Sequence, residues 1–218
     1  MNNIRCGFLK SRSEVEACTK FLHENGYASH ALTCKDWDIA QIIPQINDGN
    51  FLDMGSSGSY ILKNVLLKNI RGEKYGIDLR APDLPLPNVK YLVGDLLSVP
   101  IDDGFFDYIA CLSVIEHEVD LDKFAKEASR LLRSGGKIFV TFDYWDPQVK
   151  PRRTLYSLKW QPLDKKHVKH LVKVCAKSGL KLVEKINWDT EDTVINKAYY
   201  SPEPKIQYTF GLITLVKS

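Results

Sequence analysis

The sequence lacks any long hydrophobic run. Of its 218 residues, 44% are hydrophobic and 26% are charged, but no apolar stretch approaches the roughly 20 residues that a membrane-spanning helix needs. The N-terminal stretch MNNIRCGFLKSRSEVE also has no apolar core of the kind found in secretory signals. We therefore expect a cytoplasmic protein that does not contact a membrane.

Cysteines are few and form no recognisable pattern. They include neither a C-x-x-C pair nor the cysteine and histidine spacing typical of zinc sites. The five positions are Cys6, Cys18, Cys34, Cys111 and Cys175. We expect reduced thiols and no metal site.

The sequence also lacks an excess of one charge. It has 30 Lys and Arg residues against 27 Asp and Glu residues, a formal net charge of +3. This balance does not indicate a nucleic-acid partner, because such proteins usually carry a strongly basic surface. Internal repeats and low-complexity segments are absent as well. The length predicts one structural domain, which we divide into an N-terminal helical cap or lid (residues 1–48) and a main part (residues 49–218).

What the sequence does contain is an alternation of strand-like and helix-like segments. A first helix is expected at SEVEACTKFLHENG, where Ser13 and Glu16 form a capping box and Gly26 ends the pattern. Further helices are expected at DWDIAQIIPQI, SYILKNVLLKNI, DKKHVKHLVKVCAKSG and LDKFAKEASRLL, the last ended by Ser134-Gly135-Gly136. The β-rich runs are FLDM, KYGIDL, VKYLVG, FDYIACLS, GKIFVTF, LKLVEKINW and IQYTFGLITLVK. We expect an α/β fold, a parallel sheet covered on both faces, with a last strand that runs antiparallel.

A glycine-rich turn, Gly55-Ser56-Ser57-Gly58, joins the first β-rich run to a helix. In open α/β sheets this position brings the backbone close to a cofactor. The turn lacks the third glycine of G-x-G-x-x-G and the Gly-Lys-Ser/Thr ending of a P-loop. Asp53, just before the turn, would repel a pyrophosphate but suits a ligand that carries a positive charge.

Two more acids follow the next two β-rich runs. Asp78 ends YGID, where a carboxylate can accept hydrogen bonds from both ribose hydroxyls. Asp95 follows YLVG, where it could read an adenine amino group. Any one of these acids could instead be a turn or helix-cap residue. Three of them after three successive strands indicate a nucleoside-containing ligand.

Four stretches, FLDMGSSGS, YGIDL, GDLLSVPIDDGFFDYIACLSVIEH and ASRLLRSGGKIFVT, together resemble the class I S-adenosylmethionine-dependent methyltransferases. The most specific part is DLLSVPIDDGFFD, which is similar to the D-x-x-x-L-P-x-x-x-x-x-F-D pattern of many members. The resemblance implies a Rossmann-like seven-stranded sheet with strand order 3-2-1-4-5-7-6, strand 7 antiparallel and helices on both faces. It also implies S-adenosyl-L-methionine as cofactor and S-adenosyl-L-homocysteine as product.

The resemblance implies a cofactor site made of Asp53, Gly55, Ser56, Ser57, Gly58, Asp78, Leu79, Asp95, Leu96 and Ser113. In such a site Asp53 and the glycine turn hold the methionine end of the cofactor, Asp78 the ribose, and Asp95 the adenine. The backbone carbonyl of Ser113 faces the ammonium group. The sequence departs from the family at Ser57, which stands where most members have the middle glycine of G-x-G-x-G.

His117, in SVIEHEVD, is the candidate general base, because it follows the fourth strand and imidazole titrates in a suitable range. The alternative is that Glu116 and His117 only shape the turn before the next helix. A divalent-ion site made of Glu116, His117, Glu118 and Asp120 is less favoured than helix capping.

The candidate acceptor-binding residues are Tyr144, Trp145, Arg152 and Arg153, in a long connection after the fifth strand. Aromatic faces and arginines suit an anionic or sugar-bearing small molecule. The alternative is a solvated basic loop anchored by its aromatic residues. Upstream, Lys35 could meet the cofactor carboxylate, with Trp37 either beside it or in the core.

Three functions remain open at this point. The first is O- or N-methylation of a small-molecule acceptor by in-line displacement, with nucleic acid disfavoured as a substrate. The second is a catalytically inactive S-adenosylmethionine-binding partner subunit. The third is an NAD-dependent oxidoreductase, which Asp53 and the missing third glycine disfavour. Nothing in the sequence indicates an oligomeric state.

Overall fold

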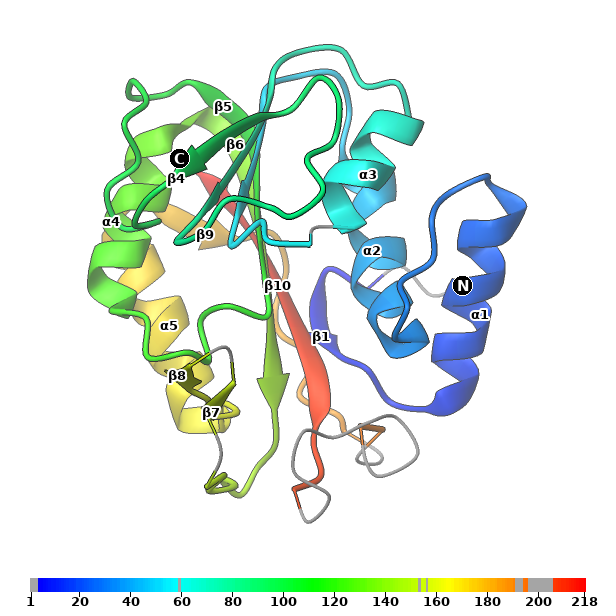
Figure 1. The fold of residues 1–218 in the computed structure, drawn as a ribbon. Helices are drawn as coiled ribbons and strands as arrows, with labels where there is room; N and C mark the ends of the chain where they lie inside the picture. Colours follow the sequence, from blue (N-terminus) through cyan, green and yellow to red (C-terminus); the bar gives the residue numbers. More distant parts are fainter. Residues whose placement is uncertain (1–3, 59, 153, 156, 191–193, 196–205) are drawn as a thin grey trace.

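The protein forms one mixed sheet with helices on both faces (Figure 1). The computed structural model describes residues 4–58, 60–152, 154–155, 157–190, 194–195 and 206–218. The strands of the sheet are β1 (Cys6–Phe8), β2 (Phe51–Met54), β3 (Lys74–Asp78), β4 (Lys90–Val93), β5 (Phe106–Leu112), β6 (Leu132–Tyr144), β9 (Leu180–Leu182) and β10 (Thr209–Lys217). A separate small hairpin joins β7 (Thr154–Leu155) to β8 (Leu158–Lys159).

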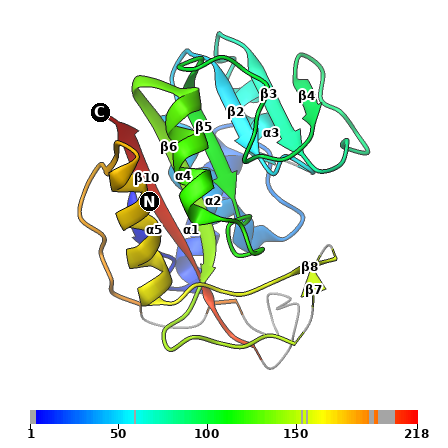
Figure 2. The same cartoon turned by 90° about the vertical axis from the view of Figure 1, so that its left-hand side faces the viewer.

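In the described part of the chain, five helices and two short 3₁₀ turns connect these strands. The helices are α1 (Arg12–Glu24), α2 (Asp36–Ile42), α3 (Tyr60–Leu67), α4 (Leu121–Leu131) and α5 (Lys165–Lys177), and the turns are Thr33–Lys35 and Ile43–Gln45. Helices α4 and α5 cover one face of the sheet, and α1, α2 and α3 cover the other (Figure 1). Figure 2 shows α4 and α5 side by side over their face.

The strand order confirms the expected fold class. Along the sheet it is β1-β10-β6-β5-β2-β3-β4, with β9 also paired to β10. Without β1, the order from the β4 edge is the expected 3-2-1-4-5-7-6. Strands β2, β3, β4, β5 and β6 are parallel to their neighbours, and β10 is antiparallel to β6, as predicted.

Strand β1 was not expected from the sequence. Its residues Cys6–Phe8 pair with Gly211–Ile213 of β10, while β9 pairs with Leu215–Lys217 of the same strand. The two short strands therefore share one edge of β10. Residues 1–48 contribute a strand to the sheet as well as helices α1 and α2, and their action as a lid stays a prediction.

Alternation along the strands divides the apolar residues into two cores. In β6, Ile138, Val140 and Phe142 pack with the α4 and α5 side, whereas Phe139 packs with the α1 to α3 side. Successive strand side chains point to opposite faces, so a strand that is covered on both faces is apolar throughout. This explains the near-continuous apolar runs of the sequence.

The capping box of α1 lies two residues earlier than predicted. The Glu14 amide donates to Ser11 Oγ at 3.3 Å, and the Glu14 carboxylate accepts a bond from the Lys10 amide at 2.8 Å. The prediction of Ser13 and Glu16 was wrong because the same S-x-x-E spacing occurs in both registers.

The predicted glycine stop after α4 was also wrong. The helix ends at Leu131, and Gly135 and Gly136 lie within β6, beside a register shift between Phe106 and Tyr108 of β5. A Cβ atom at Gly136 would lie 2.9 Å from the Arg133 carbonyl oxygen. Gly136 thus allows the backbone of β6 to approach that of β5 at Asp107 closely. It is not the residue that ends α4.

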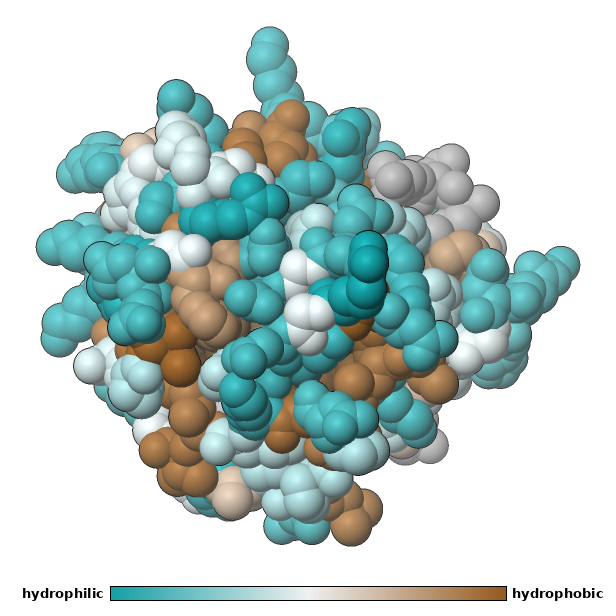
Figure 3. Space-filling model, turned by 90° about the horizontal axis from the view of Figure 1, so that it is seen from above, coloured by the Kyte–Doolittle hydropathy of each residue, from teal (hydrophilic) through white to brown (hydrophobic). Residues whose placement is uncertain are grey.

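The surface is of mixed character. Seen from above, hydrophilic residues predominate and hydrophobic residues gather in separate patches (Figure 3), as is usual for globular proteins. Among the described residues, no helix combines the length and apolar content required to cross a membrane.

Phe8 tests whether β1 belongs to the cooperative fold. Its side chain is 1% exposed, and its ring centroid lies 4.1 Å from that of Tyr144. We expect Phe8→Ala to lower the free energy of unfolding by about 3–5 kcal/mol in urea titrations, because a buried aromatic side chain is removed. Leu84→Ala, at a position that is 88% exposed, should change it by less than about 0.5 kcal/mol. Equal effects of the two changes would show that β1 is not part of the cooperative unit.

Candidate functional site

A cavity of about 660 Å³ lies at the carboxyl ends of the parallel strands. Ligands in open α/β folds bind at this edge, and small-molecule sites usually measure about 300–1,000 Å³. Segments after β2, β3, β4, β5 and β6 line it, together with residues around α2 and the start of β10. Strands far apart in the sequence thus contribute to a single site.

The glycine turn after β2 forms part of one wall. Gly55 has φ +87°, and a Cβ atom there would collide with the Val114 side chain. Gly58 has φ +75° and would meet nothing within 4 Å, so its backbone borders open space in the cavity. Only glycine adopts such positive φ angles without strain.

Ser57 at the middle of the turn is explained by its backbone. It is not among the described residues with positive φ, its side chain is exposed, and its N–H donates to Asp78 Oδ2 at 3.0 Å. A glycine is therefore not required there, and the departure from the family pattern does not disturb the turn.

Asp53, Asp78 and Asp95 all line the cavity. Asp53 is 2% exposed in β2, whereas Asp95 is exposed. Asp78 also accepts bonds from the Ser57 and Arg80 amides, and Asp95 accepts one from the Leu97 amide at 2.9 Å. Asp78 and Asp95 therefore both stabilise the turns in which they lie, and both also line the cavity.

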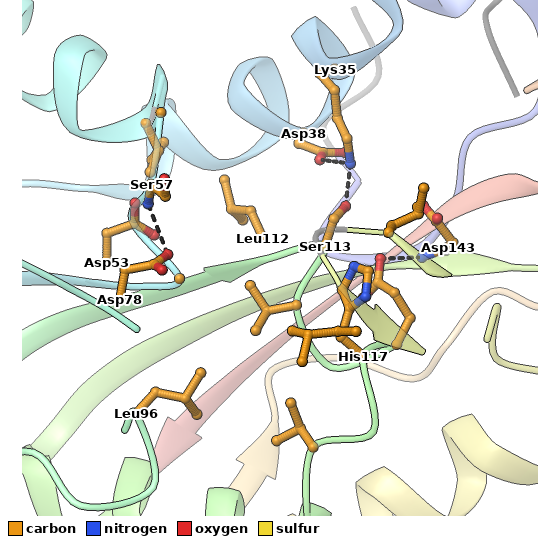
Figure 4. Close-up of a pocket in the computed structure, with 18 of the residues that line it drawn as sticks. Lys35, Asp38, Asp53, Ser57, Asp78, Leu96, Leu112, Ser113, His117 and Asp143 are labelled. Carbon is orange, nitrogen blue, oxygen red and sulfur yellow. Dashed lines mark hydrogen bonds and ion pairs between the residues drawn. The ribbon is translucent and has the colours of Figure 1, made fainter. Parts of the chain in front are cut away.

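The other predicted cofactor residues are divided. Gly55, Ser57, Gly58, Leu79, Leu96 and Ser113 line the cavity together with the three acids. Ser56 does not line it, and its buried side chain lies against Gly76 of β3 instead. In the close-up, Asp53, Ser57 and Asp78 lie on one side of the cavity and Ser113 and His117 on the other (Figure 4).

We call the side of the cavity with Asp53, Ser57 and Asp78 the first side and the side with Ser113 and His117 the second side. A group of buried charged residues lies on the second side. Lys35 donates to Asp38 Oδ2 at 3.1 Å and to Ser113 Oγ (Figure 4). Its Nζ lies 3.8 Å from the centroid of the Phe210 ring. Thr141 Oγ1 donates to the same Asp38 oxygen at 3.2 Å. Lys35 and Asp38 are three residues apart at the start of α2, which places them on one helix face.

The loop after β5 has an unusual backbone. Ser113 and Glu118 have φ of 54° and 58°, a left-handed conformation that is costly for residues other than glycine. It is held by bonds from the Ser113 amide to Thr141 and from Lys159 to the Glu118 carboxylate. The loop thereby brings Glu116 and His117 to the cavity.

Glu116 and Asp143 form a buried carboxyl pair. Glu116 Oε1 accepts a bond from the Asp143 amide at 3.2 Å, and Asp143 Oδ2 accepts one from Trp160 Nε1 at 2.8 Å. Burial and then repulsion from Asp143 raise the pKa of Glu116 well above its usual range, although Lys35 opposes this. Burial also raises the pKa of Asp143, to about 6.

Burial acts in the opposite direction on the pKa values of the basic groups on this side, because it disfavours their charged form. Burial alone would lower the pKa of Lys35, but the charges of Asp38, Asp143 and Glu116 outweigh it and raise that pKa. Burial lowers the pKa of His117, opposed by a hydrogen bond to the Lys159 backbone. Lys35 is therefore an ammonium and His117 a neutral imidazole at neutral pH.

The predicted acceptor residues lie elsewhere. Tyr144 is buried against Phe8, and burial raises its pKa to about 12. Trp145 packs against the α1 to α3 core and Arg152 is exposed. These three described residues do not line the cavity. Arg153 lies outside the described residues.

Sequence reasoning missed Asp38, Asp143, Tyr208 and Phe210, all of which line the cavity. Asp143 could have been found, since it is the next-to-last residue of β6 and Asp78 is the last residue of β3. Phe210 pairs with Asp143 in the antiparallel register, so the last strand starts at the edge where the parallel strands end. That juxtaposition has no signal in the local sequence. Trp37 is fully buried, whereas Lys35 lines the cavity.

No group of three or more His, Cys, Asp or Glu side chains arranged to hold a metal ion is found in the part of the chain that the structure describes. The five cysteines, all among the described residues, are buried and form no disulfide. Cys34 reaches the cavity wall, and burial raises its pKa to about 11.

Comparison with known proteins gives the family. Residues 52–140 match a family described as "Methyltransferase domain", and this segment contains the glycine turn and the three acids. Residues 52–140 are therefore a methyltransferase domain, and the fold around them is that of the class I S-adenosylmethionine-dependent methyltransferases. S-adenosylmethionine is the cofactor of this family.

Two curated methyltransferases match the chain over part of its length. The arsenite methyltransferase of Aquipseudomonas alcaligenes is 31% identical over 99 residues, 44% of this chain and 29% of the relative. The ubiquinone/menaquinone biosynthesis C-methyltransferase UbiE of Rickettsia prowazekii is 33% identical over 125 residues, 50% of this chain and 49% of the relative. The chain thus spans half or less of the length of these curated relatives.

Solved structures share the fold over nearly the whole chain. One comes from a complex of the Haloferax volcanii Trm112 methyltransferase activator with a methyltransferase, with a TM-score of 0.62 at 18% identity, covering 95% of this chain and 97% of that one. The [4+2]-cyclase SpnF also has a TM-score of 0.62, at 13% identity, covering 98% and 99%. Methyltransferases and a cyclase therefore share this fold.

The raised pKa of Asp143 predicts a pH dependence of stability. The folded state holds this proton up to about pH 6, whereas an unfolded aspartate releases it near pH 4. Stability should therefore fall as pH rises through this window, by up to about 3 kcal/mol for a shift of roughly two pKa units.

Asp143→Asn should remove this part of the pH slope in urea unfolding between pH 4 and 7. Asp83→Asn, at an exposed loop position, should keep the slope of the unchanged protein. If Asp143→Asn keeps the full slope as well, the carboxyl of Asp143 does not titrate in this window.

Proposed function

We propose that this protein transfers a methyl group from S-adenosylmethionine to a small-molecule acceptor by in-line displacement. The observation that carries the proposal is one cavity whose first side has the glycine turn and three strand-end acids and whose second side has a neutral imidazole. When bound, S-adenosylmethionine supplies a methyl group activated by a positively charged sulfur. The protein then needs to align the acceptor, exclude water and remove a proton.

The residues of the first side fit the cofactor. Asp53 suits a ligand with positive charge near its amino-acid end, and the open face at Gly58 leaves room for close backbone approach. Asp78 would hold the ribose hydroxyls, and Asp95 with Leu96 the adenine. From the second side, Ser113 would contribute its carbonyl to the ammonium group and Lys35 its charge to the carboxylate.

The acceptor is proposed to be a small molecule, methylated on oxygen or nitrogen. The cavity has the volume of a small-molecule site. By their names, the relatives act on arsenite and in ubiquinone and menaquinone biosynthesis, and others are N-methyltransferases of ajmaline and norajmaline in Rauvolfia serpentina. They differ in the atom that receives the methyl group, so the acceptor is argued from the residues of this chain.

A second candidate is a protein that binds S-adenosylmethionine without transferring its methyl group. The similarity to a [4+2]-cyclase favours keeping it, because one fold hosts different chemistry. Cofactor binding without formation of S-adenosylhomocysteine across an acceptor panel would support this candidate. An NAD-dependent oxidoreductase is disfavoured by Asp53 beside the turn.

Asp78 provides the test of cofactor binding. We expect Asp78→Ala to weaken binding of S-adenosylmethionine roughly 10- to 100-fold in calorimetric titration, because hydrogen bonds from the ribose to a carboxylate are lost. Asp83→Ala, at an exposed position five residues away, should bind like the unchanged protein. Tighter binding of NAD than of S-adenosylmethionine by the unchanged protein would overturn the proposal.

His117 provides the test of the base. We expect His117→Ala to lower kcat about 100-fold with little change in cofactor affinity, because the proton acceptor is lost. In the unchanged protein, kcat should rise with pH through a pKa below 6.5. His23→Ala, exposed on α1, is the control, and the rate is read as S-adenosylhomocysteine formation with small amines, phenols and carboxylic acids. An unchanged kcat in His117→Ala would assign His117 a structural role.

A further inference from the structure

The acceptor side of the cavity has an excess of buried acid. Asp38, Glu116 and Asp143 are 1%, 2% and 6% exposed, and all three line the cavity. The cation that contacts this group is Lys35. Among the described residues there, three carboxyl groups therefore face one ammonium group, while His117 is neutral.

Two of these carboxyl groups each have an oxygen without a partner. Glu116 Oε2 and Asp38 Oδ1 are buried and make no hydrogen bond to any described residue, although the second oxygen of each is bonded. A buried polar atom left unpaired is costly by about 1–3 kcal/mol. Because both residues line the cavity, a ligand that brings hydrogen-bond donors could pair with these oxygens once the side chains turn toward it.

Lys35 shows which kind of donor these surroundings stabilise. Its ammonium lies between the Asp38 carboxylate and the face of Phe210, and the nearby acids hold it charged despite its burial. Tyr208 adds a second aromatic ring to the same part of the cavity wall. Carboxylates and aromatic faces together bind ammonium groups well.

We propose that the methyl acceptor is a primary or secondary amine, bound as its ammonium ion by the carboxyl groups of Glu116 and Asp143. This inference rests on the proposed methyl transfer and replaces the anionic acceptor expected from the sequence. The arginine that the structure describes in the predicted acceptor loop, Arg152, does not line the cavity. An anionic acceptor would instead lie beside buried carboxyl groups, and each of these that is ionised would repel it strongly where water is excluded.

The chemistry balances with these groups and His117. The ammonium gives one proton to the neutral imidazole of His117, which leaves a neutral amine with a free electron pair. That pair forms the N–C bond as the S–C bond breaks, and the sulfur keeps the bonding electrons and becomes neutral. The product is a methylated ammonium ion, which the same acids bind, and the proton on His117 returns to water.

The test compares matched probes on protein loaded with S-adenosylhomocysteine. Three apolar parts, butyl, 2-phenylethyl and 2-(indol-3-yl)ethyl, are each offered as amine, alcohol and carboxylate, and binding is measured by calorimetry. We expect the amine of at least one set to bind about tenfold or more tightly than its alcohol and carboxylate, as a charged hydrogen-bonded pair requires. Only amines should be methylated when S-adenosylmethionine is supplied.

Glu116→Gln keeps the shape of the side chain and the acceptor for the Asp143 amide. We expect it to reduce amine binding about tenfold or more and to leave binding of alcohols and of S-adenosylmethionine within about twofold. Glu24→Gln, in an exposed pair with Lys20 on α1, should behave like the unchanged protein. Unfolding midpoints of all variants show whether the fold is kept, and Asp143→Asn gives a second reading if Glu116→Gln is unstable.

The outcomes separate two failures. If S-adenosylmethionine does not bind, the proposed function fails. If it binds but no amine binds more tightly than its alcohol and carboxylate, or if a carboxylate is methylated faster than its amine, the proposed function stands and the amine acceptor is overturned. Equal loss of amine and S-adenosylmethionine binding in Glu116→Gln would assign Glu116 to the cofactor, which also overturns this inference.

Discussion

The antiparallel pairing of β10 with β6 determines how the rest of the molecule is assembled. It joins residues 209–216 to residues 137–144 over eight pairs. Because β10 runs opposite to the parallel strands, it begins where they end, and its first residues stand beside Asp143 at the cavity. Its free edge then takes both β1 and β9. The same ladder therefore ties the N-terminal region to the sheet and places Phe210 at the site.

The buried charges at this edge oppose stability. Carboxyl groups removed from water are costly unless they are paired and hydrogen-bonded, and here Glu116 and Asp38 each keep an unpaired oxygen. The left-handed backbone at Ser113 and Glu118 adds strain in the same loop. Unfavourable terms of several kinds concentrated in one small region are typical of a functional site. The hydrophobic cores on the two faces of the sheet supply the stability that permits them.

Much of the fold could be predicted from residue patterns, because each long element carries its own periodicity and its own end signals. Three-residue β1 could not, since so short a strand has no pattern and depends on the partner strand 200 residues away. The acids at the carboxyl ends of β2, β3 and β4 were found because the carboxyl-end rule needs only the strand assignment. Their predicted roles still await measurement.

At the end of β6, the sequence indicated Tyr144 as an acceptor-binding residue, but the residue that lines the cavity is its neighbour Asp143. The aromatic Tyr144 attracted attention, but successive residues of a strand point to opposite faces, so Tyr144 enters the core against Phe8 while Asp143 faces the cavity. An aromatic ring such as that of Tyr144 suits a sugar-bearing ligand, whereas the carboxyl group of Asp143 suits a positively charged one.

The overall charge of +3 did not reveal this acidic site. Exposed lysines and arginines are screened by water and salt, whereas buried charges interact at a lower effective dielectric. Three buried carboxyl groups can therefore decide the charge of the ligand even in a chain that is basic as a whole.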